Sequence, residues 1–461
     1  MTQTTGATRR LGAFVASCAQ RPIETPVLEK AGMCLLDGLG LALIAHDEPT
    51  SAAMRALAIP VEGAGTARIW ADGTRTVLSD AVAANAVAVH AQFHDDTDYS
   101  SWTHPASLII STAISLGEAL DAPAERVLRG LVAGYDALVW LGANERVALS
   151  LIGRGVRTSP TLGTIGAAAT AAAILGLDED RAASAIGIAS SITGGVLEPV
   201  RLGSDEWRVQ NAHAARGGLL AAQLAARGVV GAATGLEGAK GLAKAMAGLD
   251  AVPEWEDEPR LDAILGIVAK PWATLGDNMA AAAAAKLLHD DGVDPARISS
   301  IRVRIWRHYA EYPGTSYRGP FRQTAQALAS TVFATAAMLV CGDLEYEVSN
   351  ERRDDPAILR LAERIIVEPD DEGGPADGLV EVTLDDGSVM RRTAAEAPRT
   401  LLYHDIPTAT AIFAGRFGRS GRSPDAGTSV AQTMFAAARR EGGATMRAIL
   451  DEVIPRNGAR R

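Results

Sequence analysis

Hydrophobic positions along the chain follow two different periods. From about residue 10 to residue 270, long windows rich in Ala and Leu are broken by Gly, Pro and capping residues, which predicts successive helices. The tail from about residue 405 to 461 has the same pattern. The window GTIGAAATAAAILGL, residues 163–177, has small or apolar residues on every side and therefore predicts a buried helix that its neighbours approach closely.

The pattern changes to a period of two after Lys270. In ISSIRVRIWRHY, beginning at Ile298, apolar residues alternate with arginines, which predicts a half-buried strand. The window TAQALASTVFATAAML then predicts a helix, ERIIVEPD a second strand, and GLVEVTLDDGSVMRRT a hairpin that turns at Asp386-Gly387. An earlier hairpin is predicted at residues 67–78, around Asp72-Gly73.

Together these patterns predict a mainly α protein with two domains. A large all-helical domain is built from both ends of the chain, residues 1–270 and 400–461, and a smaller α+β lid domain, residues 271–399, is inserted into it. A chain of 461 residues, 48% of them hydrophobic, is long enough for two cores.

Charge and cysteine content narrow the possible partners. A net charge of -11 argues against binding to nucleic acid or to a membrane surface, because phosphate partners require clustered Lys and Arg. The three cysteines show no CxxC spacing, so neither a disulfide framework nor a zinc finger is predicted. The N-terminal stretch has no sustained apolar region and no later window is apolar enough to span a membrane, so we expect a cytoplasmic protein.

The segment HAQFHDDTDYSSWTHPASLII, residues 90–110, concentrates the polar chemistry of the chain. His90 and His94 share a helix face, and nearby aspartates offer oxygen ligands. However, the sequence holds no second ligand cluster at matching spacing, so we do not expect a metal site.

His104 immediately precedes Pro105, which occupies the favoured first position of a predicted helix. The positive end of the helix dipole favours a neutral imidazole, the form that accepts a proton near neutral pH. The residues alone leave two interpretations open: His104 is an acid/base group, or it only satisfies a backbone group while the aspartates cap helix ends.

Several motifs together resemble the MmgE/PrpD family, which includes 2-methylcitrate dehydratase, cis-aconitate decarboxylase and iminodisuccinate epimerase. They are HDDTD, THPASLIISTAISLGEAL, GYDALVWLG at 134–142, TLGTIGAAATAAAILGLDEDRAASAIGIA, and HAARGGLLAAQLAARGVVGAATGLEG at 213–238, followed by Lys270-Pro271. The resemblance covers nearly the whole chain. It implies a helical domain with a smaller α+β lid, a homodimer without a cofactor, and an active site between the domains that takes a small carboxylated molecule.

The resemblance assigns roles to residues one at a time. His104 stands at the family's catalytic histidine, and the Asp-Asp-Thr motif is retained as Asp95, Asp96 and Thr97. Other positions differ from the family. Phe93 replaces an aspartate, Arg157 replaces a second histidine, and Ser159 replaces the threonine that follows that histidine. Trp207 or Arg208 replaces a lysine, Gln210 stands where a histidine would be, and Leu328 to Thr331 replaces a tyrosine-bearing segment. Losing a base, a lysine and a phenol together predicts that the parent reaction has changed.

We therefore expect a lyase or isomerase without a cofactor, on a specialised biosynthetic substrate rather than 2-methylcitrate. His104, Asp96 and Thr97 are the predicted catalytic residues, with Asp96 orienting His104. The predicted substrate-binding residues are Asp95, Phe93, Tyr135, Arg157, Ser159, Trp207, Arg208, Lys270 and Thr331. Two positions keep an alternative: Arg157 as a solvated loop residue and Tyr135 as a core tyrosine with a satisfied hydroxyl.

Two further expectations concern the lid and the class of protein. The run WRHYAEYPGTSYRGPFR, residues 306–322, with Tyr309, Tyr312 and Tyr317, is predicted to be a lid loop over the active site. The alternative to an enzyme is a descendant of the family that binds a metabolite or partner protein without catalysis.

Overall fold

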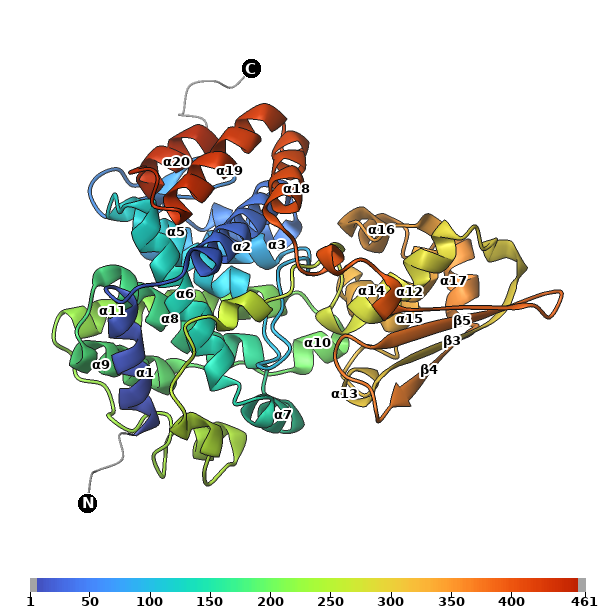
Figure 1. Ribbon diagram of the computed structural model, residues 1–461, viewed down its shortest axis with the longest axis horizontal. Coiled ribbons are helices and arrows are strands. Elements are labelled where there is room, and N and C mark those ends of the chain that lie inside the picture. Colours follow the sequence, from blue (N-terminus) through green and yellow to red (C-terminus); the bar gives the residue numbers. More distant parts are fainter. Residues whose placement is uncertain (1–5, 455–461) are drawn as a thin grey trace.

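The computed structural model describes residues 6–454, in a mainly helical fold with a small mixed sheet, so the predicted fold class is confirmed. Figure 1 shows a larger helical body and a smaller one that carries the sheet. Residues 1–5 and 455–461, which the predicted helical domain includes, lie outside the described part.

The helical domain draws its elements from both ends of the chain. Its N-terminal part contains α1 (Ala7–Cys18), α2 (Thr25–Ile44), α3 (Pro49–Ala56), β1 (Thr66–Arg68), β2 (Arg75–Val77), α4 (Leu78–His90), α5 (Pro105–Ala119), α6 (Ala124–Leu141), α7 (Arg146–Gly153), α8 (Thr158–Leu175), α9 (Glu179–Ile192), α10 (Glu198–Leu202) and α11 (Glu206–Ala226). Its C-terminal part contains α18 (Ile406–Arg419), α19 (Pro424–Ala438) and α20 (Met446–Val453), which pack on α2 and α5 (Figure 1). The predicted early hairpin is confirmed, since β1 and β2 pair antiparallel.

Helix α8 lies at the centre of this domain, as its composition predicted. All its residues but the last are buried, and it packs against α5, α6 and α11. Small side chains permit these close approaches: a Cβ atom on Gly218 of α11 would lie 2.4 Å from the Thr164 carbonyl oxygen of α8. The buried small-residue helix fixes where its own first turn, which carries site residues, lies.

The lid domain contains α12 (Met279–Asp290), β3 (Ile298–Trp306), α13 (Arg307–Ala310), α14 (Thr324–Ala329), α15 (Thr331–Cys341), α16 (Tyr346–Glu351), α17 (Pro356–Ala362), β4 (Ile365–Asp370), β5 (Gly378–Leu384) and β6 (Val389–Thr393). The sheet has the order β4-β3-β5-β6, in which β3 is parallel to β4 and antiparallel to β5. Helices α12 and α15 pack together, and α12 also packs on β5 and β6.

Period-two patterning in the lid domain is confirmed in detail. On β3, Ile301, Val303 and Ile305 are buried, whereas Arg302 and Arg304 are exposed. The hairpin at Asp386-Gly387 joins β5 to β6 as predicted. The single predicted helix over TAQALASTVFATAAML is instead two helices, because Ser330 leaves the helical conformation and its hydroxyl caps α15 by accepting from the Phe333 amide at 3.0 Å.

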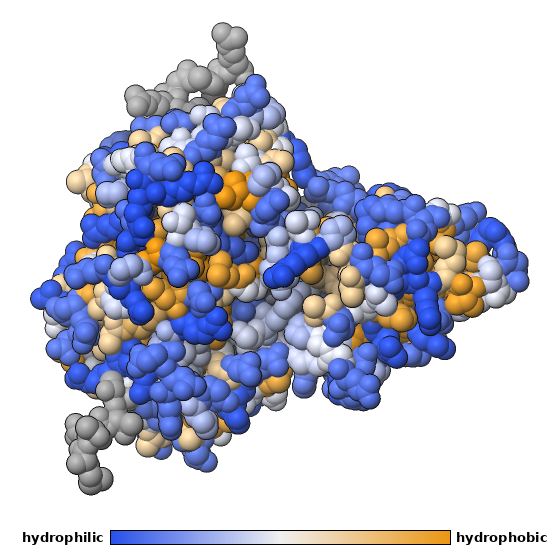
Figure 2. All heavy atoms as spheres, in the orientation of Figure 1, coloured by the Kyte–Doolittle hydropathy of each residue, from blue (hydrophilic) through white to orange (hydrophobic). Residues whose placement is uncertain are grey.

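Separate hydrophobic cores fill the two domains, one from residues 7–267 and 413–454 and the other from residues 272–382. A third, smaller cluster joins them and includes Phe93, Trp207, Leu275 and Leu328. The surface in Figure 2 mixes hydrophilic and hydrophobic residues over both bodies. Within residues 6–454, no helix has the length and apolar character needed to cross a membrane.

Candidate active site

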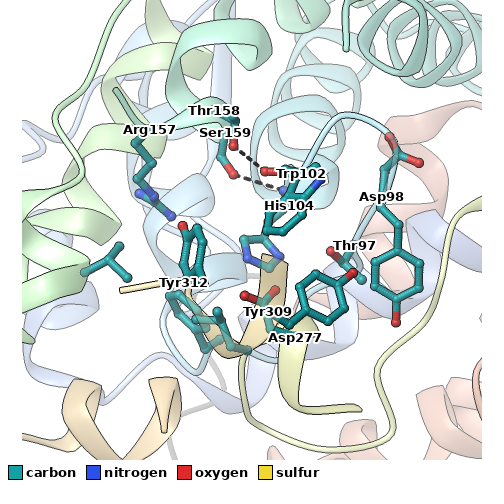
Figure 3. Close-up of a pocket in the computed structure, with 14 residues that line it drawn as sticks. Thr97, Asp98, Trp102, His104, Arg157, Thr158, Ser159, Asp277, Tyr309 and Tyr312 are labelled. Carbon is teal, nitrogen blue, oxygen red and sulfur yellow. Dashed lines mark hydrogen bonds between the residues drawn. The ribbon is translucent and has the colours of Figure 1, made fainter. Parts of the chain in front are cut away.

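A pocket lies where the two domains meet, directly beside the joining cluster, and its volume is about 440 Å³ when the open solvent at its mouth is included. Four parts of the chain form it: the loop between α4 and α5, the first turn of α8, helix α10, and lid segments around the 3₁₀ turn Gly276–Asn278 and after β3. Its walls are Phe93, Thr97, Asp98, Tyr99, Trp102, His104, Arg157, Thr158, Ser159, Val200, Leu275, Asp277, Tyr309 and Tyr312 (Figure 3).

His104 stands at the start of α5, with Pro105 in the first helical position as predicted. Its Nδ1 lies 3.1 Å from the Asp96 carbonyl oxygen, and its backbone N–H donates to Ser159 Oγ at 3.0 Å. Since a carbonyl oxygen only accepts, Nδ1 carries the hydrogen and Nε2 carries the lone pair. Burial, with Lys270 nearby, holds the pKa of His104 well below its usual range, so the ring is neutral near pH 7.

Asp96 contacts His104 through its main chain, whereas we expected the carboxyl group to orient the imidazole. The contact to the imidazole is made by the main-chain carbonyl, whereas both carboxyl oxygens are hydrogen-bonded to other groups. Asp96 Oδ1 accepts from the Ala106 amide at 2.8 Å and Oδ2 accepts from the Tyr135 hydroxyl at 2.6 Å. Burial raises the pKa of Asp96 to about 8. Tyr135 therefore has a satisfied hydroxyl within the core, and it does not line the pocket.

Arg157 is buried and lines the pocket, so the solvated-loop alternative is wrong. Its guanidinium donates to the Trp207 carbonyl at 2.6 Å, to Gln210 Oε1 at 3.2 Å and to His90 Nε2 at 2.8 Å. Although burial lowers its pKa to about 10, Arg157 remains protonated at neutral pH. The structure thus places one oriented cation in the wall of the pocket.

A buried chain of three side chains holds Arg157 in place. Arginine can only donate, so His90 Nε2 is the acceptor and His90 Nδ1 donates to Asp95, 2.8 Å from Oδ2. Burial and the neighbouring cations hold the pKa of His90 well below its usual range. Asp95 therefore acts behind the wall rather than at the pocket surface, and sequence reasoning did not assign His90 this role.

The remaining predicted substrate contacts divide between the wall and a layer behind it. Phe93 and Ser159 line the pocket, as does Thr97, which we predicted to be catalytic. Four others do not: the Trp207 ring lies edge-on to Phe93 with 4.2 Å between centroids, Arg208 donates to the Ala91 carbonyl at 2.8 Å, Lys270 donates to the Phe93 and Thr274 carbonyls, and Thr331 donates to Asn278 Oδ1 at 2.6 Å. These four support the wall: Trp207 does so through its ring, and the polar groups of Arg208, Lys270 and Thr331 are already used within the protein.

Residues that sequence reasoning did not single out supply much of the wall. Asp277 and Tyr99 are buried or nearly so at the pocket, and Asp98 accepts from Ser100 and Ser101. By contrast, Tyr309 and Tyr312, which also line the pocket, belong to the aromatic run at residues 306–322 that we predicted to cover the active site. For Asp277 the only signal was its position shortly after Lys270-Pro271.

The arrangement can bind an anion and accept a proton. Arg157 supplies fixed positive charge, and His104 Nε2 supplies a lone pair in the same pocket. Within residues 6–454, no three or more His, Cys, Asp or Glu side chains are grouped so that they could hold a metal ion. His90 and His94, the pair considered for a metal, instead contact Arg157 and Arg416, respectively.

Fold and site together define a class: a mainly helical protein of two domains, with a polar pocket lined from both and a neutral histidine in its wall. The MmgE/PrpD N-terminal domain matches residues 9–254, and the MmgE/PrpD C-terminal domain matches residues 276–402. The chain belongs to the MmgE/PrpD family, as the motifs of its sequence predicted.

Its curated relatives are distant. The chain is 30% identical over 233 residues to the cis-aconitate decarboxylase-like protein oryM of Aspergillus oryzae. The matched region covers 49% of this chain and 48% of that protein. It is 26% identical over 225 residues to cis-aconitate decarboxylase of Aspergillus terreus. This matched region covers 48% of this chain and 46% of that protein. The match thus spans about half the length of these relatives.

Proposed function

We propose that this protein is a lyase or isomerase that needs no cofactor and moves a proton at a carbon next to a carboxylate or carbonyl group. One observation carries the proposal: the unprotonated Nε2 of His104 and the guanidinium of Arg157 share one pocket between the domains. Kinship with cis-aconitate decarboxylases supports a lyase-type reaction.

Charges in the wall favour a substrate with a single carboxylate. Arg157 is the one Lys or Arg among the lining residues, and two carboxyl groups, Asp98 and Asp277, lie in the same wall. The ammonium group of Lys270 is held by two main-chain carbonyls behind it. A tricarboxylate such as cis-aconitate would bring two carboxylates into the pocket without cationic partners, which is costly in a partly desolvated site.

Aromatic side chains define the rest of the substrate. Phe93, Trp102, Tyr309 and Tyr312 present ring surface to the pocket, which suits an apolar or aromatic body attached to the carboxylate. We therefore propose a specialised, biosynthetic monocarboxylate rather than 2-methylcitrate.

In the proposed reaction Arg157 binds the carboxylate, and His104 Nε2 takes a proton from the adjacent carbon. Arg157 then stabilises the negative charge that develops on the carboxylate, because a buried guanidinium is oriented before the reaction begins. Thr97 and Ser159 lie in the same wall and are positioned to contact the substrate. Positioned bases of this kind accelerate proton transfer by about 10²- to 10⁴-fold.

The proposal is tested by proton exchange in D2O. Wild type and His104→Gln are incubated with 3-hydroxy-3-phenylpropanoate, cinnamate, cis-aconitate, 2-methylcitrate and iminodisuccinate, and deuterium uptake and product are followed by NMR. We expect activity on a monocarboxylate and its loss by about 10²-fold or more in His104→Gln. Rapid turnover of cis-aconitate, 2-methylcitrate or iminodisuccinate would defeat the substrate class, and full activity of His104→Gln would defeat the role of His104.

The same assay separates an enzyme from a non-catalytic binding protein. Binding of a monocarboxylate, followed through tryptophan fluorescence, with neither exchange nor turnover would favour the binding protein. Assembly as a homodimer and a cytoplasmic location stay predictions, of which sedimentation velocity tests the first.

A further inference from the structure

Three polar atoms in the pocket wall have no hydrogen-bond partner within the described residues, although they are buried. They are Asp277 Oδ2, Tyr99 Oη and Tyr309 Oη. Buried polar groups are normally paired, so unpaired ones that converge on a single pocket indicate groups that a ligand satisfies. Asp277 is the one among them able to give up a proton near neutral pH.

Asp277 is held firmly although Oδ2 of its carboxyl group has no partner within the described residues. It is 8% exposed and lies in the 3₁₀ turn Gly276–Asn278 of the lid domain. The Asn278 side chain on one side of it donates to Thr274 Oγ1 at 2.7 Å and accepts from Thr331 at 2.6 Å. On the other side, the Leu275 amide donates to the Leu328 carbonyl at 3.0 Å. Neighbouring residues therefore carry the anchoring contacts, and Oδ2 of Asp277 is left to the pocket.

The turn also lies directly against the helical domain. A Cβ atom on Gly276 would be 2.9 Å from Thr97 Oγ1, so only glycine allows this approach without displacement of Thr97. Figure 3 shows the Asp277 carboxyl group and the His104 ring in the same pocket, one from each domain. The two titratable groups meet only because the lid domain is docked on the helical domain.

We propose that Asp277 is the second proton-transfer group of the site and acts as the acid opposite the base His104. This inference rests on the proposed function. For elimination of water, His104 Nε2 takes the proton from the carbon next to the carboxylate, and that C–H electron pair forms the C=C bond. The C–O bond breaks, and the protonated Asp277 carboxyl group gives its proton to the departing hydroxide, forming water. His104 is then protonated and Asp277 ionised, and exchange of one proton with solvent returns both to their starting states.

The surroundings of Asp277 favour this division of roles. Burial raises the pKa of Asp277 to about 7, and the positive charge of Lys270 opposes that rise. Tyr99, Tyr309 and Tyr312 line the same pocket; burial raises the pKa values of all three phenols, and the charge of Asp277, when it is ionised, adds to that rise. The pKa of His104 is lowered and that of Asp277 is raised, so a neutral imidazole and a protonated carboxyl group are present together. Such a pair is suited to act as base and acid.

Asp277→Asn tests the inference, because the amide keeps the size and polarity of the side chain but has no carboxylic proton. Asp136→Asn is the matched control: Asp136 is also buried with an unpaired oxygen, but it lies on α6 away from the pocket. With 3-hydroxy-3-phenylpropanoate as probe, we expect kcat to fall about 10²-fold or more in Asp277→Asn while KM changes little, and Asp136→Asn to match wild type. If Asp277→Asn keeps wild-type kcat while His104→Gln has lost it, the inference is overturned and the proposed function stands.

A second measurement decides the matter without turnover. Protein labelled with carbon-13 in the aspartate carboxyl groups is titrated by NMR, and Asp277 is assigned by the resonance missing from Asp277→Asn. We expect it to titrate near pH 7 and to shift when cinnamate binds. An Asp277 that is already ionised at pH 5, or that does not respond to cinnamate when the tryptophan fluorescence does, overturns the inference whatever the substrate is.

Discussion

The buried carboxyl group of Asp277 makes the protein less stable as the pH rises, and Asp277→Asn isolates this effect. In the folded protein, burial raises its pKa from 3.8 to about 7. Between these values the unfolded chain has an ionised Asp277, whereas the folded protein must keep the proton. The folded state thus binds more protons, so its stability falls as the pH rises from 3.8 towards 7 and is constant above about 8.

The size of the effect follows from the shift. Each unit of pKa difference corresponds to about 1.4 kcal/mol, so Asp277 contributes a loss of about 4 kcal/mol between about pH 4 and pH 8. Asparagine does not ionise, and the variant therefore lacks this loss. Relative to wild type, Asp277→Asn should gain about 4 kcal/mol over that range, although it is expected to be inactive.

Urea unfolding at several pH values, followed by tryptophan fluorescence and circular dichroism, measures the effect. Coincident transitions from the two probes are required before free energies are compared, because the chain has two domains. Asp180→Asn serves as control, since the Asp180 side chain is 85% exposed. Curves for Asp277→Asn and wild type that stay parallel from pH 4 to pH 8 would refute the reasoning.

Three further substitutions test the wall, the core and the support of the site. Arg157→Gln removes the cation and should raise KM for a monocarboxylate about 10- to 100-fold in steady-state kinetics, whereas unchanged KM would remove Arg157 from binding. Gly218→Ala forces a Cβ against the backbone of α8 and should cost about 1–3 kcal/mol in urea, with Gly153→Ala, which meets nothing within 4 Å, as the neutral control. Tyr135→Phe leaves Asp96 Oδ2 without its donor and should cost about 1–3 kcal/mol; an unaltered urea midpoint would contradict that.

Much of the fold could be predicted from the sequence because the relevant signals are local. Alternation of apolar and charged residues at Ile301 to Ile305 depends only on the pleat of one strand, and Asp386-Gly387 has the turn chemistry that a hairpin needs. The break at Ser330 was missed because hydrophobicity continues through it, while a hydroxyl cap decides that a new helix begins.

The site was predictable only in part. His104 at a helix start and Arg157 before the small-residue helix follow from local sequence. The hydrogen-bond partners of the other polar groups do not follow from local sequence. Lys270, Arg208 and Asp96 have the chemistry of site residues, but their hydrogen bonds go to main-chain groups, to Asp205 or to Tyr135. Which partner a buried polar group finds is settled by packing between distant segments.

The sequence by itself determined the helical and period-two parts of the chain, the family and the position of His104 at the start of α5, because period, turn chemistry and motif spacing are properties of neighbouring residues. Only the tertiary structure decided that Asp277 shares a pocket with His104, and that Arg157 is oriented through His90 by Asp95. The physical reason is that docking of the lid domain removes water from these groups. Burial then sets both their partners and their pKa values.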